Sequence, residues 1–362
     1  MTTFIQLHFL TAYAPANLNR DESGRPKTAI MGGVERLRIS SQSIKRAWRV
    51  SEAFHQAVDQ NVGKRTRLMG YEYVYKPMIN GGIEEKISKT SAERVAAQFG
   101  KVKCVNKSTI KEYLETEQIV NLSNYEIELI NSLTSQLING NREPREDELS
   151  FLRKEQHSVD IALFGRMLTN PDKSDNKSVI KNRVQFNVEA ACQVSHPISV
   201  NAVAVERDFF TAVDDLNQDE SGSAHMNEHE FASALFYTYL CINRDLLVEN
   251  LGGDEALAKR AIVALTKASL TVAPTGKQNS FASRAYASYA LAEIGQQQPR
   301  SLAAAFFTPV RGEDQIQTAI KRLEAQRDSF EKVYGKCADD QCAFSVPESR
   351  GSLDALLTFV GQ

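Results

Sequence analysis

The basic residues that could bind an anionic ligand are concentrated between Asn19 and Arg49. This segment holds eight Lys or Arg residues and three acidic residues, a local charge of +5, whereas the 362-residue chain has a formal net charge of −2. A basic segment in a nearly neutral chain indicates a localised anionic partner, such as a nucleic acid, rather than general affinity for anions. The basic residues are Arg20, Arg25, Lys27, Arg36, Arg38, Lys45, Arg46 and Arg49.

The end of this segment has the periodicity of an amphipathic helix, at about 100° per residue. The predicted buried side consists of Ile44, Ala47, Trp48, Ser51 and Phe54. The predicted polar side consists of Gln42, Lys45, Arg46 and Arg49. Ser40 or Ser41 is placed to cap the helix, whose first-turn N–H groups could also bind an anion. The alternative is an ordinary solvated helix face, which is what a charged stripe alone usually indicates.

Two further positions could contribute to nucleic-acid binding. Proteins that bind single strands combine cations that follow the phosphates with planar or apolar side chains against which bases stack. Lys277 lies in a loop, 274–281, that contains a Gly-Lys pair. Met167 follows Gly165-Arg166 and could be an apolar wedge between bases, although a core position is the commoner role of methionine.

No set of residues predicts catalysis. Gly276-Lys277-Gln278 lacks the first Gly and the Ser/Thr of a phosphate-binding P-loop. His225 and His229 have a helix-compatible spacing but not the H-E-x-x-H order of zinc hydrolases. Asp214-Asp215 could be a metal site of a nuclease, although paired acids in a wide acidic run are more often a cap or a solvated turn. The five scattered cysteines do not have zinc-ligand spacing, so we expect reduced thiols, no metal and no cofactor.

The hydrophobic patterns predict a single α+β core with excursions. Residues 3–13 and 231–241 have the composition of buried strands, and Arg36 to Ser40 alternates like a half-exposed strand. Residues 183–212 alternate again and predict a hairpin-like excursion, whereas 59–181 is polar and helix-favouring. Helices are expected at about 254–270 and 313–334. The stretch 205–230 contains eight acidic residues and would repel a nucleic acid, so we expect it to face elsewhere, for example a basic patch on a neighbouring copy.

The N-terminal block from Leu18 to Ala47 resembles the CasC family, whose members form the repeated backbone of the type I-E CRISPR surveillance complex, Cascade. Further similar motifs follow in order along the chain. They are V-D-I-A-L-F-G-R-M at 159–167, F-T-A-V-D-D at 210–215, G-S-A-H at 222–225, E-N-L-G-G at 249–253 and G-K-Q at 276–278.

This resemblance implies an α+β protein shaped like a right hand. The palm, a modified RRM-like (ferredoxin-like) fold, would comprise 1–58 and 182–362. The fingers would be a helical insertion at 59–181, and the thumb a β-hairpin at 183–212 within the palm segment. Copies would stack head to tail along a CRISPR guide RNA, whose bases remain available to pair with target DNA in antiviral defence. Other Cascade subunits would be further partners, and we expect a cytoplasmic location without membrane association.

The resemblance also implies the site residues. The guide-contacting positions would be Arg20, Lys27, Ser40, Gln42, Lys45 and Arg49, with Met167 as a wedge at a kinked nucleotide. The helix periodicity and the second loop add Ser43, Arg46 and Lys277. The family implies a non-catalytic protein. The alternative is a metal-dependent ribonuclease related to type III backbone proteins, with Asp214 or Asp215 as the acid.

Overall fold

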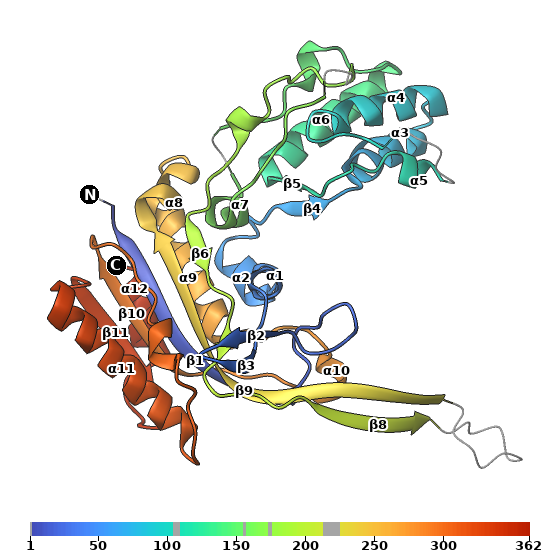
Figure 1. Cartoon of the computed structure of the whole chain (residues 1–362). Helices are drawn as coiled ribbons and strands as arrows, with labels where there is room; N and C mark the ends of the chain where they lie inside the picture. Colours follow the sequence, from blue (N-terminus) through green and yellow to red (C-terminus); the bar gives the residue numbers. More distant parts are fainter. Residues whose placement is uncertain (1, 104–108, 155–156, 173–175, 213–224) are drawn as a thin grey trace, which may run out of the picture. The chain divides into compact units, whose positions relative to one another are not determined.

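The computed structural model describes residues 2–103, 109–154, 157–172, 176–212 and 225–362 (Figure 1). The chain divides into two compact units. The first, here called the sheet unit, comprises Met1–Ala57, Cys192–Arg244 and Lys259–Gln362. The second, the helical unit, comprises Val58–Ala191 and Asp245–Ala258.

The sheet unit is built on an antiparallel sheet in which β1 is central. The order β11-β10-β1-β9-β6 places β1 between β10 and β9, and β7 and β8 also pair with β9. The apolar run at the start of the chain explains this position, because a strand that is buried along nearly its whole length needs partners on both edges. The strands are β1 (Phe4–Ala16), β6 (Cys192–Val194), β7 (Ile198–Ser199), β8 (Glu206–Ala212), β9 (His225–Asn243), β10 (Ala287–Gly295) and β11 (Asp340–Ser345).

Helices complete the α+β architecture that the sequence predicts. The 3₁₀ helix at Ala303–Phe306 and α11 pack on one side of the sheet through Phe306, Ala319 and Leu323. The predicted helices at 254–270 and 313–334 are confirmed as α9 and α11. The helices of the sheet unit are α1 (Ser41–Arg49), α2 (Glu52–Ala57), the greater part of α9 (Glu255–Thr271), α10 (Gln278–Phe281), α11 (Gln315–Tyr334) and α12 (Leu353–Val360). Helix α8 (Arg244–Asn250) and the first turn of α9 fall in the helical unit.

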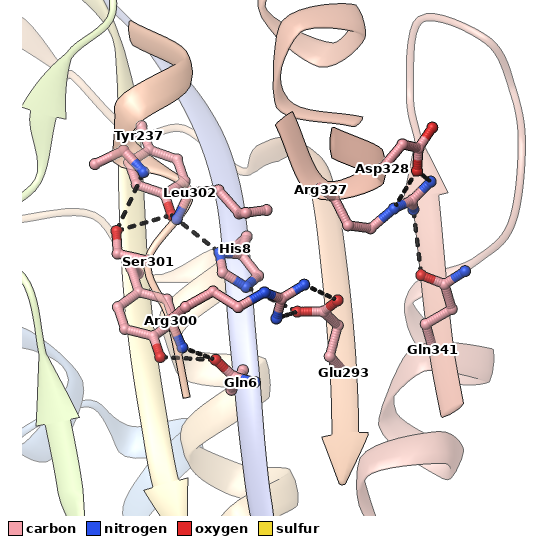
Figure 2. A network of polar contacts seen from close by, with 12 residues as sticks. Gln6, His8, Tyr237, Glu293, Arg300, Ser301, Leu302, Arg327, Asp328 and Gln341 are labelled. Carbon is pink, nitrogen blue, oxygen red and sulfur yellow. Dashed lines mark hydrogen bonds and ion pairs between the residues drawn. The ribbon is translucent and has the colours of Figure 1, made fainter. Parts of the chain in front are cut away.

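A buried polar network ties the sheet to the segment that follows β10 (Figure 2). His8 Nδ1 lies 2.9 Å from the Tyr237 hydroxyl, and His8 Nε2 lies 3.2 Å from Glu293 Oε2. Arg300 donates to both oxygens of Glu293, at 2.6 and 2.9 Å. Burial alone would raise the pKa of Glu293, but the bonds from His8 and Arg300 lower this pKa to about 2. The carboxylate is therefore charged and paired across three neighbouring elements.

A small hairpin precedes α1. Strands β2 (Thr28–Met31) and β3 (Val34–Leu37) are joined by Gly32 and Gly33, which have φ values of +63° and +78°. A Cβ on Gly32 would lie 1.7 Å from the Phe307 carbonyl oxygen, so the turn requires glycine. Strand β3 covers only the first two residues of the strand predicted from Arg36 to Ser40. It ends at Leu37, because Arg38 forms only an isolated bridge with Ile198.

The range 183–212 is not a hairpin by itself, which corrects the sequence interpretation. It contains a 3₁₀ turn (Val184–Phe186) and strands β6, β7 and β8, each of which pairs with β9. The extended hairpin is formed by β8 and β9, from Glu206 opposite Phe231 to Ala212 opposite His225 (Figure 1). Alternation identified the strands but not their partner, because register and pairing depend on residues that are distant in sequence.

The helical unit has a hydrophobic core of its own, which includes Met69, Phe99, Leu133 and Phe151. The helix-favouring composition of 59–181 agrees with the helices found there, of which α4 and α6 are the longest in this range, and α6 begins with a capping box made by Ser123 and Glu126. The elements are β4 (Lys64–Thr66), a π-helix (Tyr71–Tyr75), α3 (Lys76–Asn80), α4 (Glu85–Ala96), α5 (Ile110–Tyr113), β5 (Val120–Leu122), α6 (Asn124–Gly140), a 3₁₀ helix (Asp147–Leu149) and α7 (Val159–Phe164).

Candidate nucleic-acid interface

Asn19 connects the basic loop to the start of α1. Its backbone oxygen accepts a hydrogen bond from the Lys27 N–H at 2.8 Å, and its Oδ1 accepts one from the Ser40 N–H at 2.8 Å. The Lys27 oxygen in turn accepts the Arg38 N–H at 2.8 Å. These bonds hold the loop that carries Arg20 and Lys27 against the N-terminus of helix α1.

The second loop reaches the same place through a close backbone approach. A Cβ on Gly276 would lie 2.2 Å from the Leu18 oxygen, so only glycine allows this contact. Lys277 follows with a φ of +51°, and its side chain lines a hollow of about 330 Å³ together with Arg20, Arg25 and Phe281. The structure thus brings Arg20 and Lys277 together, although they lie 257 positions apart in the sequence.

The predicted polar face of α1 is present in its first two turns. Gln42 and Arg46 are exposed, and Ser43 and Lys45 are half-buried. The predicted buried side is confirmed for Ile44, Ala47 and Trp48, and Phe54 is buried in the next helix, α2. The polar and apolar sides of the helix are therefore arranged as the periodicity predicts up to Arg46.

Arg49 does not belong to the exposed face, which corrects the periodicity-based prediction. Its side chain is only 7% exposed, and Ala47, Trp48 and Arg49 are consecutive buried residues. Three consecutive residues span roughly 200° of a helix, so the last turn of α1 is enclosed on more than one side. The helical wheel assumes a single buried side, and the chain turns at Val50 into α2, where that assumption fails.

The first turn of α1 is less open to anions than expected. Ser40 is half-buried and caps the helix, since its Oγ accepts the Ser43 N–H at 3.4 Å. The Ser41 N–H donates to His196 Nδ1 at 2.9 Å. His196, which the sequence interpretation did not select, is exposed beside the helix start, and its accepting Nδ1 places the proton of the neutral ring on Nε2.

Two other cations of the basic segment are engaged within the protein. Arg36 is fully buried and donates to the carbonyl oxygens of Ser199, Val200 and Phe306. Arg25 forms an ion pair with Glu230 at 2.6 Å. The acidic stretch therefore faces the basic loop of the same chain at Glu230, which corrects the expectation that it faces elsewhere.

The other cations, apart from the buried Arg49, are five that are exposed or half-buried, and Lys277 is a sixth half-buried cation at the site. The six are Arg20, Lys27, Arg38, Lys45, Arg46 and Lys277.

Aromatic groups lie next to these cations. Lys277 Nζ is 3.2 Å from His229 Nδ1, and the Phe210 ring stacks on His229 with centroids 4.3 Å apart. Phe281 lines the same hollow and contacts Phe231. Proteins that bind single-stranded nucleic acids commonly combine cations, which contact the phosphates, with planar rings, on which the bases stack. Sequence reasoning missed both rings because His229 reaches Arg20 through the pairing of β9, and Phe281 reaches it through the segment that contacts Leu18 at Gly276.

Met167 lies in the helical unit and is 81% exposed, so the alternative of a core methionine is wrong. The backbone around it is fixed. Arg166 and Val188 exchange two hydrogen bonds at 3.0 Å, and the Leu168 N–H donates to Asn187 Oδ1 at 2.6 Å. The buried Arg166 guanidinium also pairs with Glu126 at 2.8 Å. An apolar side chain is thus presented to solvent from a rigid support.

Asp214 and Asp215 lie outside the described residues. Within the ranges that the structure describes, no group of three or more His, Cys, Asp or Glu side chains could hold a metal ion. In the same ranges, no helix is long and apolar enough to cross a membrane.

Residues 5–356 match the family model of the CT1975-like proteins. Among solved structures, a chain of "CRISPR RNA-guided surveillance complex, pre-nicking" superimposes with a TM-score of 0.80 and 26% identity, covering 99% of this chain and 100% of that chain. A chain of "CRISPR RNA-guided surveillance complex" superimposes with a TM-score of 0.71 and 21% identity, covering 99% of both chains, which shows a shared fold. A search of curated proteins finds no match.

Proposed function

The chain belongs to the CT1975-like family, and from this membership we propose that it is a CRISPR RNA-binding subunit of a Cascade-type surveillance complex. The observation that carries the proposal is the group of cations gathered around Asn19. The loop that precedes the β2–β3 hairpin and the distant loop at 274–281 bring Arg20, Lys27 and Lys277 close to the start of α1. The likeness to a chain of an RNA-guided complex supports a guide RNA as the anionic partner.

The charges of this site suit a single strand. The six accessible cations can neutralise several phosphates, and Phe281 and His229 provide planar groups for bases. The peptide N–H groups near the helix start are largely bonded within the protein. We therefore assign the grip on the phosphates to the side chains of Arg20, Lys27, Lys45, Arg46 and Lys277, and a positioning role to Ser40, Gln42 and Ser43.

In finer detail, we propose a CasC-type backbone subunit of a type I-E complex. Copies would stack head to tail along the guide and contact other subunits of the complex, and the guide bases would pair with target DNA. The sheet unit would be the RRM-like palm, and Met167 the wedge at a kinked nucleotide. We propose that the subunit does not cleave nucleic acid.

The test is to purify the protein with the products of neighbouring genes and to examine the nucleic acid that it retains. The expected result is a high A260/A280 ratio and a single RNA of uniform length on a denaturing gel. A monomer free of nucleic acid would overturn the proposal. Divalent-metal-dependent cleavage of paired RNA, abolished by Asp214→Ala or Asp215→Ala, would instead support the ribonuclease alternative.

A further inference from the structure

His196 is exposed beside the start of α1. Its Nδ1 accepts the Ser41 backbone N–H at 2.9 Å, and a guanidinium nitrogen of Arg38 lies 3.4 Å from the same atom. A peptide N–H and a guanidinium can only donate, so the proton of the neutral ring is on Nε2. We propose that this Nε2–H donates a hydrogen bond to a ribose 2′-hydroxyl of the bound strand and thereby selects RNA over DNA, an inference that rests on the proposed function.

The backbone on both sides of His196 is fixed before a ligand arrives. Pro197 follows directly, and a residue that precedes proline is restricted to extended conformations. The Pro197 oxygen accepts the Ile39 N–H at 3.0 Å, next to the start of α1. The Ser195 N–H donates to the Tyr239 oxygen of β9 at 2.9 Å. The ring is therefore already oriented, and its Nε2–H loses little conformational freedom when it binds one ligand group.

The charges around His196 favour a sugar over a phosphate as its ligand. Cationic Arg38 and Lys27 are joined by a backbone hydrogen bond of 2.8 Å, beside the ring. Lys45 follows Ser41 by four positions, about one turn of α1. Hydrogen bonds from cations to phosphate are roughly twice as strong as those from neutral donors, so we assign the phosphates to the cations. A sugar lies between successive phosphates, and its hydroxyl is left for the neutral donor.

The 2′-hydroxyl is the group by which a protein distinguishes RNA from DNA at a given position. Its oxygen can accept a hydrogen bond from an N–H, whereas deoxyribose offers only carbon-bound hydrogen at this place. The phosphates are the same in both polymers, so the cations of the site cannot supply this selectivity. One hydrogen bond between neutral groups contributes modestly, and its loss should weaken binding about fivefold.

The first experiment uses the wild-type protein and synthetic RNA strands that carry one 2′-deoxyribose at successive positions. At least one position should bind about fivefold more weakly than all-ribose RNA. A 2′-fluoro group at that position should cause the same loss, because it keeps the sugar pucker of RNA but accepts hydrogen bonds poorly and donates none. Full recovery of affinity with 2′-fluoro would show that the protein reads sugar conformation instead, and the proposal would fail.

The substitution His196→Asn separates the RNA contact from the structural role of the ring. The new Oδ1 takes the place of Nδ1 and can accept the Ser41 N–H, but no group reaches the position of Nε2. The variant should keep the wild-type stability in urea, bind all-ribose RNA about fivefold more weakly and show no deoxyribose penalty at the identified position. The matched control His55→Asn makes the same change in α2 and should retain the full penalty.

Two results for His196→Asn would overturn the 2′-hydroxyl contact. One is a deoxyribose penalty equal to that of the wild-type protein. The other is an equal loss of affinity for RNA and for DNA of the same sequence, which indicates a contact with phosphate. In both cases the wild-type protein still binds RNA and the proposed function stands. If the wild-type protein binds no RNA of any kind, the proposed function itself is overturned.

Discussion

Two arginines of α1 allow the RNA-binding face to be tested with matched substitutions. Arg46 and Arg49 lie three positions apart on one helix and carry the same charge, but Arg46 is exposed and Arg49 is 7% exposed. Arg46→Ala should weaken RNA binding without changing stability. Arg49→Ala should mainly lower the free energy of unfolding, because the long side chain packs in the interior at the end of the helix.

The magnitudes follow from the number of accessible cations. If the five cations assigned to the phosphates all contact a single strand, log K should fall with log salt concentration with a slope of about −3.5. Removal of Arg46 should reduce this slope by about 0.7 and the affinity at 0.1 M salt by about fivefold. Arg49→Ala should cost about 1–3 kcal/mol of stability, as expected for loss of buried packing.

Fluorescence anisotropy of labelled single-stranded RNA at several salt concentrations measures the slope, and urea denaturation measures the stability. Each variant is the control for the other, since the change in net charge is identical. The reasoning would be refuted if Arg46→Ala left the slope unchanged. It would equally be refuted if Arg49→Ala reduced the slope by a full 0.7 with no loss of stability.

Three further outcomes are expected. Glu126→Gln should destabilise the helical unit by about 3–5 kcal/mol, because it leaves the buried Arg166 charge without its carboxylate. Urea denaturation measures this change, and a loss of stability below about 1 kcal/mol would contradict the prediction. Burial and the nearby Arg166 charge lower the pKa of His157 to about 4. As the pH falls, His157 is therefore protonated in the unfolded chain at a higher pH than in the folded protein. Stability should therefore be unaffected above about pH 6.5 and should fall by up to about 1.4 kcal/mol per pH unit from there to about pH 4. His157→Gln should remove that part of the slope, and an unchanged pH profile would exclude the assignment. Gly276→Ala should weaken RNA binding several-fold, because a Cβ at 276 would lie 2.2 Å from a backbone oxygen and displace Lys277. Gly140→Ala, whose Cβ would meet only the flexible Arg142 side chain at 3.3 Å, should not. Equal affinities for the two variants would show that the 274–281 loop does not bind RNA.

Local patterns predicted those parts of the fold that depend on neighbouring residues. The apolar runs identified β1 and the core part of β9, and helical periodicity identified α9, α11 and the buried side of α1. These predictions succeed because a strand or an amphipathic helix needs its apolar residues at a fixed short period. The same patterns failed for 183–212, where alternation revealed strands but not that all of them pair with β9.

The sequence by itself determined that a strongly basic segment exists, and it left open whether the helical part of this segment is a binding face or an ordinary solvated face. Only the tertiary structure decided which of these charges are available. Arg36 donates to carbonyl oxygens in the interior, Arg49 is only 7% exposed, and Arg25 is paired with Glu230. The structure also brought Lys277 to Arg20 through a glycine contact. Charge is a property of each residue, whereas desolvation and pairing depend on partners far along the chain, so the number of basic residues overestimates the site until the fold is known.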